Sequence, residues 1–190
     1  MPPRTVADLI YTALASLDGY INDRDGQFAF ATPDAEVHAF VNELERPIAT
    51  YLYGRRLYEI MEVWDTLDTS HEPPEMRDYA EQWRGADKVV YSSSLAEVTT
   101  SRTRLERTFD ADAVRALVRD AETDVAIGGP TLAAHAFAAD LVDDVHLFLN
   151  PVLVGGGTRA LPDDVSLQLE LVDEHRFANG VIHLHHRVLH

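Results

Sequence analysis

Short apolar runs alternate with segments of helical periodicity along most of this chain. Apolar runs that end in Gly, Ser or Asp are typical of buried strands, and apolar positions spaced i, i+3, i+4 and i+7 indicate helices. This alternation predicts an α/β fold with a mostly parallel sheet. The expected strands cover residues 6–15, 48–53, 88–91, 124–127, 145–154, 167–177 and 181–189.

The segments between these strands carry helix signals. Thr32 is expected to be the N-cap of the first helix, with Pro33 in its first helical position. A short helix should follow Gly54, and residues 65–74 form a polar loop before the next helix. The apolar helix faces are Val37, Phe40, Val41 and Leu44; Met76, Tyr79 and Trp83; and, after an N-cap at Asp110, Val114, Leu117, Val118 and Ala121.

The last two strands have a different connection from the others. They meet at Ala178-Asn179-Gly180, which is a hairpin signal. A terminal antiparallel hairpin on a mainly parallel sheet gives a mixed sheet. The length fits one domain over residues 1–190, which we expect to be a three-layer α/β/α unit.

Composition narrows the classes of function and partner. The chain has 32 Asp+Glu against 16 Lys+Arg, a net charge of −16, so we expect neither nucleic acid nor an anionic membrane as a partner. The absence of cysteine excludes disulfides, thiolate nucleophiles and zinc ribbons. No apolar stretch approaches the ~20 residues of a membrane span, and the N-terminus lacks the order of a signal peptide, so a cytoplasmic location is expected.

The C-terminal histidines are candidates for a metal site. His183 and His185 should share one strand face, with His186 on the other. No third ligand of matching geometry accompanies them, so we expect no metal. Solvated strand histidines, or an oligomer surface, explain them better.

Three predicted strands end in residues that suit phosphate groups. Gly128-Gly129-Pro130 brings two glycines to a helix N-terminus, where the backbone N–H groups attract anions. Gly54-Arg55-Arg56 offers guanidinium groups, and Ser92-Ser93-Ser94 offers hydroxyls. Each of these is also compatible with an ordinary turn or surface charge. Because ligands bind at the carboxyl ends of parallel strands, together they predict one phosphate-binding edge.

Six short segments, taken in their order along the chain, resemble the RibD C-terminal domain family, which is the reductase domain of the riboflavin-biosynthesis deaminase–reductase. The likeness runs from about residue 6 to residue 188. The deaminase half is absent, since the chain has no cysteine and no zinc-deaminase motif. The matching segments are Ala15-Ser16-Leu17-Asp18-Gly19-Tyr20-Ile21, Gly54-Arg55-Arg56-Leu57-Tyr58-Glu59, Tyr91-Ser92-Ser93, Gly128-Gly129-Pro130-Thr131-Leu132-Ala133, Leu141-Val142-Asp143-Asp144-Val145 and Asn150-Pro151-Val152-Leu153-Val154-Gly155-Gly156-Gly157.

The resemblance implies a dihydrofolate-reductase-like fold, NADPH as hydride donor and a homodimer. It also implies reduction of a C=N or C=O group in a small pyrimidine-, pterin- or related substrate, as in riboflavin biosynthesis. The residues it places at the cofactor are Ala13, Leu14, Ile21 and Thr158 at the nicotinamide; Gly54, Arg55, Arg56 and Leu57 along the adenosine and phosphates; Ser92 and Ser93 at the 2′-phosphate; and Ile127, Gly128, Gly129, Thr131 and Leu132 at the pyrophosphate.

The proton that must accompany hydride transfer needs a donor. Asp18, in the turn beside the expected nicotinamide, is the family-matched candidate. An Asp-Gly turn also uses aspartate for its shape alone, so that interpretation stays open. Dihydrofolate reductases place a carboxylate in the first helix, where Asp34 and Glu36 lie, and both also suit a helix N-terminus.

Two other functions remain open. One is a true dihydrofolate reductase, although the chain has no tryptophan between Asp18 and Pro33. The other is a non-catalytic module that binds a nucleotide in the same cleft. The expected substrate loops, residues 22–31 and 65–74, hold Arg24 as their one arginine, which argues against a phosphorylated substrate.

Overall fold

The computed structural model describes residues 7–190, so Val6, the predicted start of the first strand, lies outside the described residues. Eight strands form one sheet in the order β4-β3-β2-β5-β1-β6-β8-β7. All neighbours pair in parallel except β6–β8 and β8–β7. The mixed sheet with a C-terminal hairpin is therefore confirmed. The strands are β1 (Leu9–Ser16), β2 (Thr50–Gly54), β3 (Asp87–Tyr91), β4 (Thr103–Glu106), β5 (Val125–Gly128), β6 (Asp144–Asn150), β7 (Gln168–Arg176) and β8 (Ile182–Leu189).

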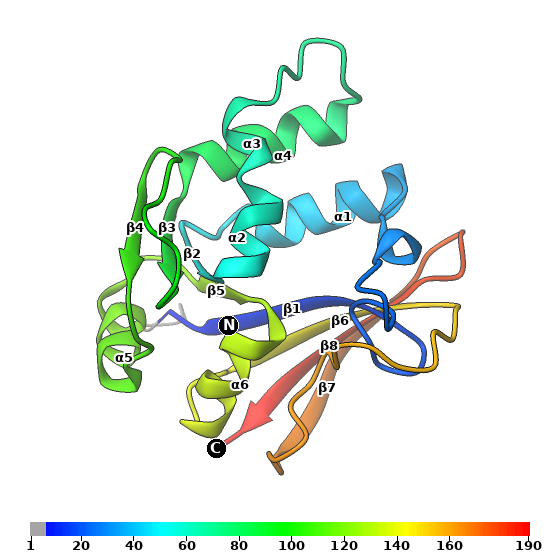
Figure 1. Cartoon of the computed structure of the whole chain (residues 1–190). Coiled ribbons are helices and arrows are strands. Elements are labelled where there is room, and N and C mark those ends of the chain that lie inside the picture. The colour runs from blue at the N-terminus through cyan, green and yellow to red at the C-terminus, as the bar shows by residue number, and fades with distance from the viewer. Residues whose placement is uncertain (1–6) are drawn as a thin grey trace.

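Helices cover both faces of the sheet, which confirms the three-layer arrangement (Figure 1). One apolar layer joins Tyr11 of β1 to Phe137, with ring centroids 5.5 Å apart. The layer on the opposite face contains Tyr58 and Trp83 against β2 and β3. The helices are α1 (Ala35–Glu45), α2 (Arg55–Met61), α3 (Val63–Thr66), α4 (Pro74–Gly85), α5 (Ala111–Asp120) and α6 (Pro130–Ala138), with a 3-10 turn η1 (Ala29–Ala31).

The start of α1 differs from the prediction. Asp34 is the N-cap, and its carboxylate accepts the backbone N–H of Val37 at 3.0 Å. Thr32 and Pro33 precede the helix. The prediction is wrong because aspartate, two positions further on, supplies the capping acceptor. Asp110 caps α5 as predicted, accepting the N–H of Ala113.

The structure also differs from the prediction at the end of one strand and at both ends of one loop. The strand predicted over residues 145–154 ends at Asn150, because Pro151 has no N–H for the ladder and the Val152 N–H turns back to the Asn150 carbonyl at 2.8 Å. The polar loop predicted over residues 65–74 is shorter, since α3 occupies its start and α4 begins at its end.

Strand β4 is absent from the sequence prediction. Its residues, Thr-Arg-Leu-Glu, hold one apolar side chain, Leu105, so they have no buried-strand pattern. The strand forms because its backbone pairs with β3 at the edge of the sheet, from Lys88↔Thr103 to Tyr91↔Glu106. It extends the carboxyl edge of the parallel sheet by one strand.

One of the C-terminal histidines, His183, is not solvated as predicted, whereas His185 and His186 are partly exposed and His190 is exposed. His183 is 2% exposed, because Phe40 of α1 packs over it with ring centroids 5.0 Å apart. His183 and His185 do share one face, and both contact the ring of His146. Within residues 7–190, no group of three or more His, Asp or Glu side chains could hold a metal ion. Over the same residues, no helix is long and apolar enough to cross a membrane.

Candidate functional site

The three predicted phosphate-binding turns lie side by side at the carboxyl edge of the sheet. Gly54 at the end of β2 pairs with Tyr91 at the end of β3, and Tyr53 pairs with Gly128 of β5. Tyr91 in turn pairs with Glu106 at the end of β4. Four neighbouring strands therefore deliver their loops to the same edge, as the sequence predicted for three of them.

Glycines let helices α2 and α6 begin close together at this edge. A β-carbon on Gly128 would lie 2.5 Å from Leu57 Cδ2, and one on Gly54 would lie 3.6 Å from Leu132 Cβ. Gly129 has a φ of +88°, a conformation that favours glycine. A side chain at Gly128 would collide with the end of the Leu57 side chain and press on the Tyr53 ring, so these two side chains would have to move.

The starts of α2 and α6 also differ from those of α1 and α5. Neither has a capping side chain, and neither has an acidic residue in its first turn. In contrast, Asp34 caps α1 and Asp110 caps α5. The first amide groups of α2 and α6 thus keep their positive partial charge without a side-chain acceptor, which favours an anion between them.

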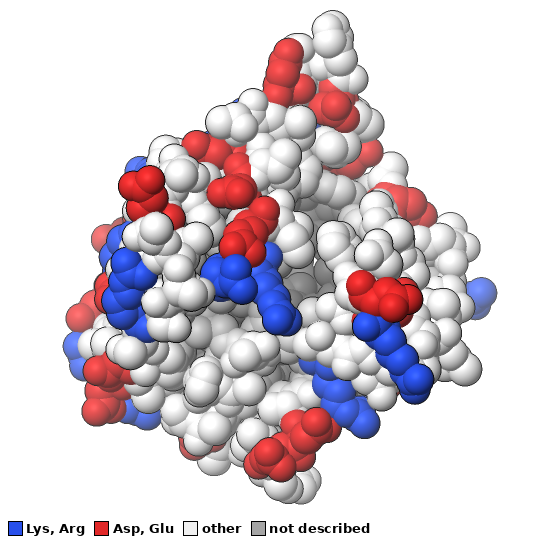
Figure 2. All heavy atoms as spheres, in the orientation of Figure 1, with Lys and Arg blue, Asp and Glu red and all other residues white. Residues whose placement is uncertain are grey.

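The two arginines at the start of α2 have different surroundings. Arg55 forms an exposed ion pair with Glu59 at 3.1 Å. Arg56 instead lines a cavity of about 410 Å³ and has no carboxylate partner within residues 7–190. Figure 2 shows basic side chains beside a recess near the middle of this face. The residues around the cavity are Asn22, Asp23, Arg24, Gly26, Arg56, Gly157 and Thr158.

The opposite wall of this cavity consists of two loops that are bonded to each other. The Ile21 N–H donates to the Thr158 carbonyl, and the Thr158 N–H donates to Asn22 Oδ1, both at 2.9 Å. A β-carbon on Gly157 would collide with the Asn22 carbonyl, so this position requires glycine. Arg24 Nη2 donates to the Gly155 carbonyl at 2.7 Å. Ile21 and Thr158, both expected near the nicotinamide, are brought together here.

Asp18 also helps to form this wall, because its side chain is hydrogen-bonded to the second loop. Its carboxylate accepts the backbone N–H of Val154 at 3.2 Å and that of Gly155 at 2.8 Å. A hydrogen bond from the Ser16 side chain, together with these amides, lowers the pKa of Asp18 below its ordinary value. An ionised carboxylate that holds a loop fits the turn-shaping interpretation better than the role of proton donor.

The other two carboxylates considered for the proton have structural contacts as well. Asp34 caps α1, and Glu36 Oε2 accepts the Ala178 N–H at 3.1 Å. Each candidate carboxylate therefore already accepts backbone hydrogen bonds.

Several residues expected at the cofactor are set back from the surface. Ser92 is 7% exposed, and its Oγ accepts the N–H groups of Ser94 and Leu95, as an ordinary turn former does, while Ser93 is exposed. The side chains of Ala13, Ile127 and Leu132 lie in the apolar core, whereas Leu14 packs on the α1 side and Thr131 is exposed.

Sequence reasoning missed one basic residue at this edge. Arg107 follows the unpredicted strand β4 and donates to three carbonyl groups of the turn after β3, those of Ser92, Leu95 and Ala96. Because β4 is absent from the prediction, no pattern along the chain indicated that Arg107 would lie beside the serines.

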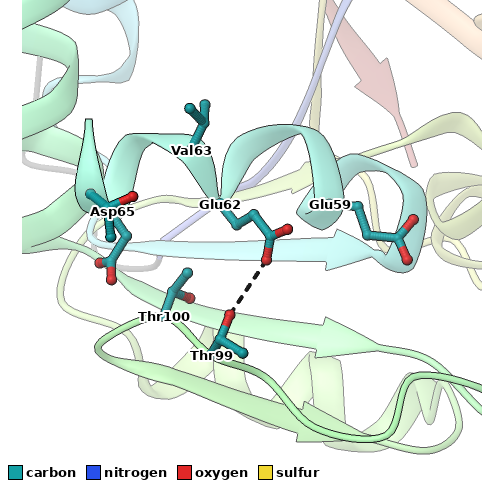
Figure 3. Close-up of a pocket in the computed structure, with 7 residues that line it drawn as sticks. Glu59, Glu62, Val63, Asp65, Thr99 and Thr100 are labelled. Atoms are coloured by element: carbon teal, nitrogen blue, oxygen red, sulfur yellow. Dashed lines mark hydrogen bonds between the residues drawn. The ribbon is translucent and has the colours of Figure 1, made fainter. Parts of the chain in front are cut away.

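A second cavity, of about 470 Å³, lies between α2, α3 and the loop before β4 (Figure 3). Its lining includes the carboxylates of Glu59, Glu62 and Asp65, and Thr99 Oγ1 donates to Glu62 Oε2 at 3.4 Å. Three carboxylates would repel a phosphate group. The anion-binding features thus belong to the carboxyl edge and not to this cavity.

A family model described as the RibD C-terminal domain matches residues 7–183. Among solved structures, a Shewanella sp. PV-4 protein assigned to riboflavin biosynthesis is 18% identical, with a TM-score of 0.72 over 96% of this chain and 99% of that one. A pyrimidine reductase-like protein of Corynebacterium diphtheriae is 14% identical, with a TM-score of 0.68 over 97% and 92% of the two chains.

A Thermotoga maritima diaminohydroxyphosphoribosylaminopyrimidine deaminase/5-amino-6-(5-phosphoribosylamino)uracil reductase is 16% identical, with a TM-score of 0.66. The match covers 97% of this chain and 57% of the Thermotoga chain. These likenesses agree with the dihydrofolate-reductase-like fold. No curated protein matches the sequence.

Proposed function

Because this chain belongs to the RibD C-terminal domain family, we propose that it is an NADPH-dependent reductase of small heterocyclic substrates. The observation that carries the proposal is the pair of uncapped helix starts, α2 and α6, which meet at the carboxyl ends of β2 and β5. Two such N-termini, with no acid in either first turn, suit the pyrophosphate of a dinucleotide.

The surrounding residues fit the rest of such a cofactor. Gly129 leaves the backbone open beside the pyrophosphate position, since only Leu57 Cβ lies within 4 Å of where its β-carbon would be, and Arg56 supplies a cation without a carboxylate partner. Ile21 and Thr158 lie together on the opposite wall, where the nicotinamide would be held. When bound, NADPH supplies the hydride for reduction of a C=N or C=O carbon.

Asp18 contributes by holding the wall of the cleft. Its ionised carboxylate fixes the Val154 and Gly155 amides, and so orients the loop that carries Thr158. With Asp18, Asp34 and Glu36 all bonded to backbone amides, the proton comes from water in the cleft.

A pyrimidine-like substrate is the class that the relatives' names support. The cavity between Arg24 and Arg56 has room for such a ring. Asp34, which caps α1, argues against a true dihydrofolate reductase. Asp18, Asp34 and Glu36 all accept backbone hydrogen bonds and none is a free proton donor, which favours one other function, that of a non-catalytic nucleotide-binding module.

The experiment that separates these functions has two stages. Titration of the purified protein with NADPH, followed by cofactor fluorescence, tests binding. Loss of NADPH absorbance with a pyrimidine substrate of riboflavin biosynthesis, and separately with dihydrofolate, tests turnover. Binding without turnover of any candidate would favour the non-catalytic module, and absence of binding would contradict the reductase.

The functional unit we propose is a homodimer. Leu169 and Leu171 of β7 and Ile182 of β8 lie on one face of the hairpin and are 43%, 52% and 41% exposed. All nine residues of the edge strand β7 are exposed. An apolar face at a free sheet edge is a surface that proteins usually cover, here with a second copy of the chain.

A further inference from the structure

Arg24 is fixed on the wall of the cavity that faces Arg56. Its Nη2 donates to the Gly155 carbonyl at 2.7 Å. Its stem lies against Gly156, where a β-carbon would be 3.2 Å from Arg24 Cγ and 3.4 Å from Arg24 Cδ. Because a guanidinium has five N–H donors and Arg24 has no other acceptor within residues 7–190, the remaining donors can bind a ligand in the cavity.

Neither arginine of the cavity is neutralised by an ion pair. Within residues 7–190, no carboxylate forms an ion pair with Arg24 or Arg56. In contrast, Arg159, which follows Thr158 in the sequence, pairs with Asp163 at 2.9 Å. The two unpaired guanidinium groups reach the same cavity from different elements, since Arg56 belongs to α2 and Arg24 to the loop after β1. Their positive charge is therefore available to a ligand.

The only acidic residue among those that line the cavity is Asp23. Its Oδ1 accepts the backbone N–H groups of Asp25, at 2.9 Å, and Gln27, at 2.8 Å, so this carboxylate shapes its own loop. Two arginines and one aspartate leave the lining with one positive charge in excess, in a chain whose net charge is −16. This local excess favours an anion, and a single negative charge would balance it.

The uncharged polar side chains of the lining also offer hydrogen-bond donors. Asn22 Oδ1 accepts the Thr158 N–H at 2.9 Å, which fixes the side-chain amide. Among residues 7–190, neither the Asn22 NH₂ group nor the Thr158 hydroxyl has a hydrogen-bond partner. None of the residues around the cavity has an aromatic or aliphatic side chain. Such a donor-rich lining suits the oxygens of an anionic group.

We propose that Arg24 and Arg56 bind a carboxylate carried by the substrate, so that the substrate is a monoanionic heterocycle such as a pyrimidine carboxylate. The inference rests on the proposed reductase function and names the substrate class of the same cleft. A carboxylate has the single negative charge that the lining can balance, whereas a phosphate group carries about −1.5 to −2 at pH 7. Because the cavity includes Thr158, the bound carboxylate would hold the substrate beside the proposed nicotinamide position.

The test compares orotate, which is the 6-carboxylate of uracil, with uracil itself. Calorimetry gives the dissociation constants of both for the wild-type protein, without a dinucleotide and with saturating NADP⁺, which has no hydride to transfer. We expect orotate to bind about tenfold or more tightly than uracil, as for a charge-assisted hydrogen bond. Uridine 5′-monophosphate, titrated in the same way, offers a phosphate in place of the carboxylate. Tighter binding of this nucleotide than of orotate would overturn the proposal.

Two variants assign the preference to the arginines. Arg24→Gln and Arg56→Gln should each lower the ratio of orotate affinity to uracil affinity about fivefold or more, because each removes one charged donor. Arg56→Gln is the cleaner variant, since Arg56 makes no side-chain hydrogen bond within residues 7–190 and its loss takes no contact from the fold. Arg159→Gln is the matched control, because Arg159 is paired with Asp163 and its removal should leave the ratio unchanged.

Each remaining result supports or overturns the proposal. A lower ratio in Arg24→Gln alone would overturn it, because Arg24 would then only hold the loop at Gly155. A wild-type protein that binds orotate no better than uracil, or binds neither, would also overturn it, and NADPH binding by that protein would leave the proposed reductase intact. Preference for orotate in a protein that binds no NADPH would support the carboxylate site and contradict the reductase.

Discussion

The carboxylate of Asp18 accepts the backbone N–H of Gly155 at 2.8 Å, and so joins the turn after β1 to the loop that contains Gly155-Gly156-Gly157. The carbonyl of the same Gly155 accepts a hydrogen bond from Arg24 at 2.7 Å. Side chains of one loop thus hold both polar groups of a single glycine in the other. This double contact makes the two loops one wall of the cleft.

Asp18→Asn should lower the turnover rate without changing the shape of its dependence on pH. The amide would place an NH₂ group against one of the two backbone N–H donors, so the Gly155 loop would lose one anchor. The pKa of Asp18 is already below its ordinary value, so the carboxyl is ionised throughout the neutral range. Steady-state kinetics over a range of pH check this. If the variant binds NADPH normally but its low residual turnover no longer falls with rising pH as the wild-type rate does, Asp18 is the proton donor after all.

Gly129→Asp should abolish NADPH binding in a folded protein, because its carboxylate would lie at the pyrophosphate position. The matched control is Gly180→Asp, since both glycines have a φ of +88° and Gly180 lies in the β7–β8 hairpin turn. Each substitution should destabilise the fold by about 1–2 kcal/mol through its left-handed backbone conformation. Thermal melts and NADPH titration of both variants separate strain from charge. Similar NADPH affinity in the two variants would show that Gly129 is not part of the binding site.

The protein should lose stability as the pH falls below about 6.5. His146 Nδ1 lies 2.9 Å from His183 Nε2, and burial, followed by the charge of His185, lowers the pKa of His146 to about 3 and that of His183 to about 4. The unfolded chain binds these protons near pH 6.5, so the stabilisation is complete above that pH and is lost as the pH falls towards 4. Each histidine should contribute roughly 1–2 kcal/mol of this loss by about pH 5.

Urea unfolding at about pH 7.5 and about pH 5 measures this effect. His183→Phe, which places a ring among Phe40, Phe148 and Phe177, should reduce the pH dependence. The exposed His71→Gln should not change it. An unchanged pH dependence in His183→Phe would show that other groups cause the loss.

Leu171→Glu should convert the proposed dimer into monomers. Leu171 is 52% exposed on the edge strand β7, and a charge there would oppose burial against a second copy. Ile60→Glu, on α2 and 46% exposed, is the control that should leave the dimer intact. Size-exclusion chromatography with light scattering gives the masses. A wild-type monomer would contradict the dimer directly.

The basic residues of the cleft illustrate the limit of the sequence prediction. Arg55 and Arg56 are equivalent in the sequence, yet Arg55 pairs with Glu59 and Arg56 faces the cavity. Arg107 was missed because β4, which precedes it, has only Leu105 as an apolar residue. Edge strands are defined by backbone pairing with a neighbour, which a local pattern of side chains does not report.

The sequence by itself determined the α/β alternation, the hairpin at Ala178-Asn179-Gly180 and the strand-end turns that meet at one carboxyl edge. These depend on local periodicity and turn residues, which act over a few positions along the chain. Only the tertiary structure decided that Asp18 binds amides 136 and 137 residues away, that Phe40 buries His183, and which arginines keep a free charge. Hydrogen-bond partners, burial and ion pairing depend on distances through space, and those are fixed only when remote segments pack together.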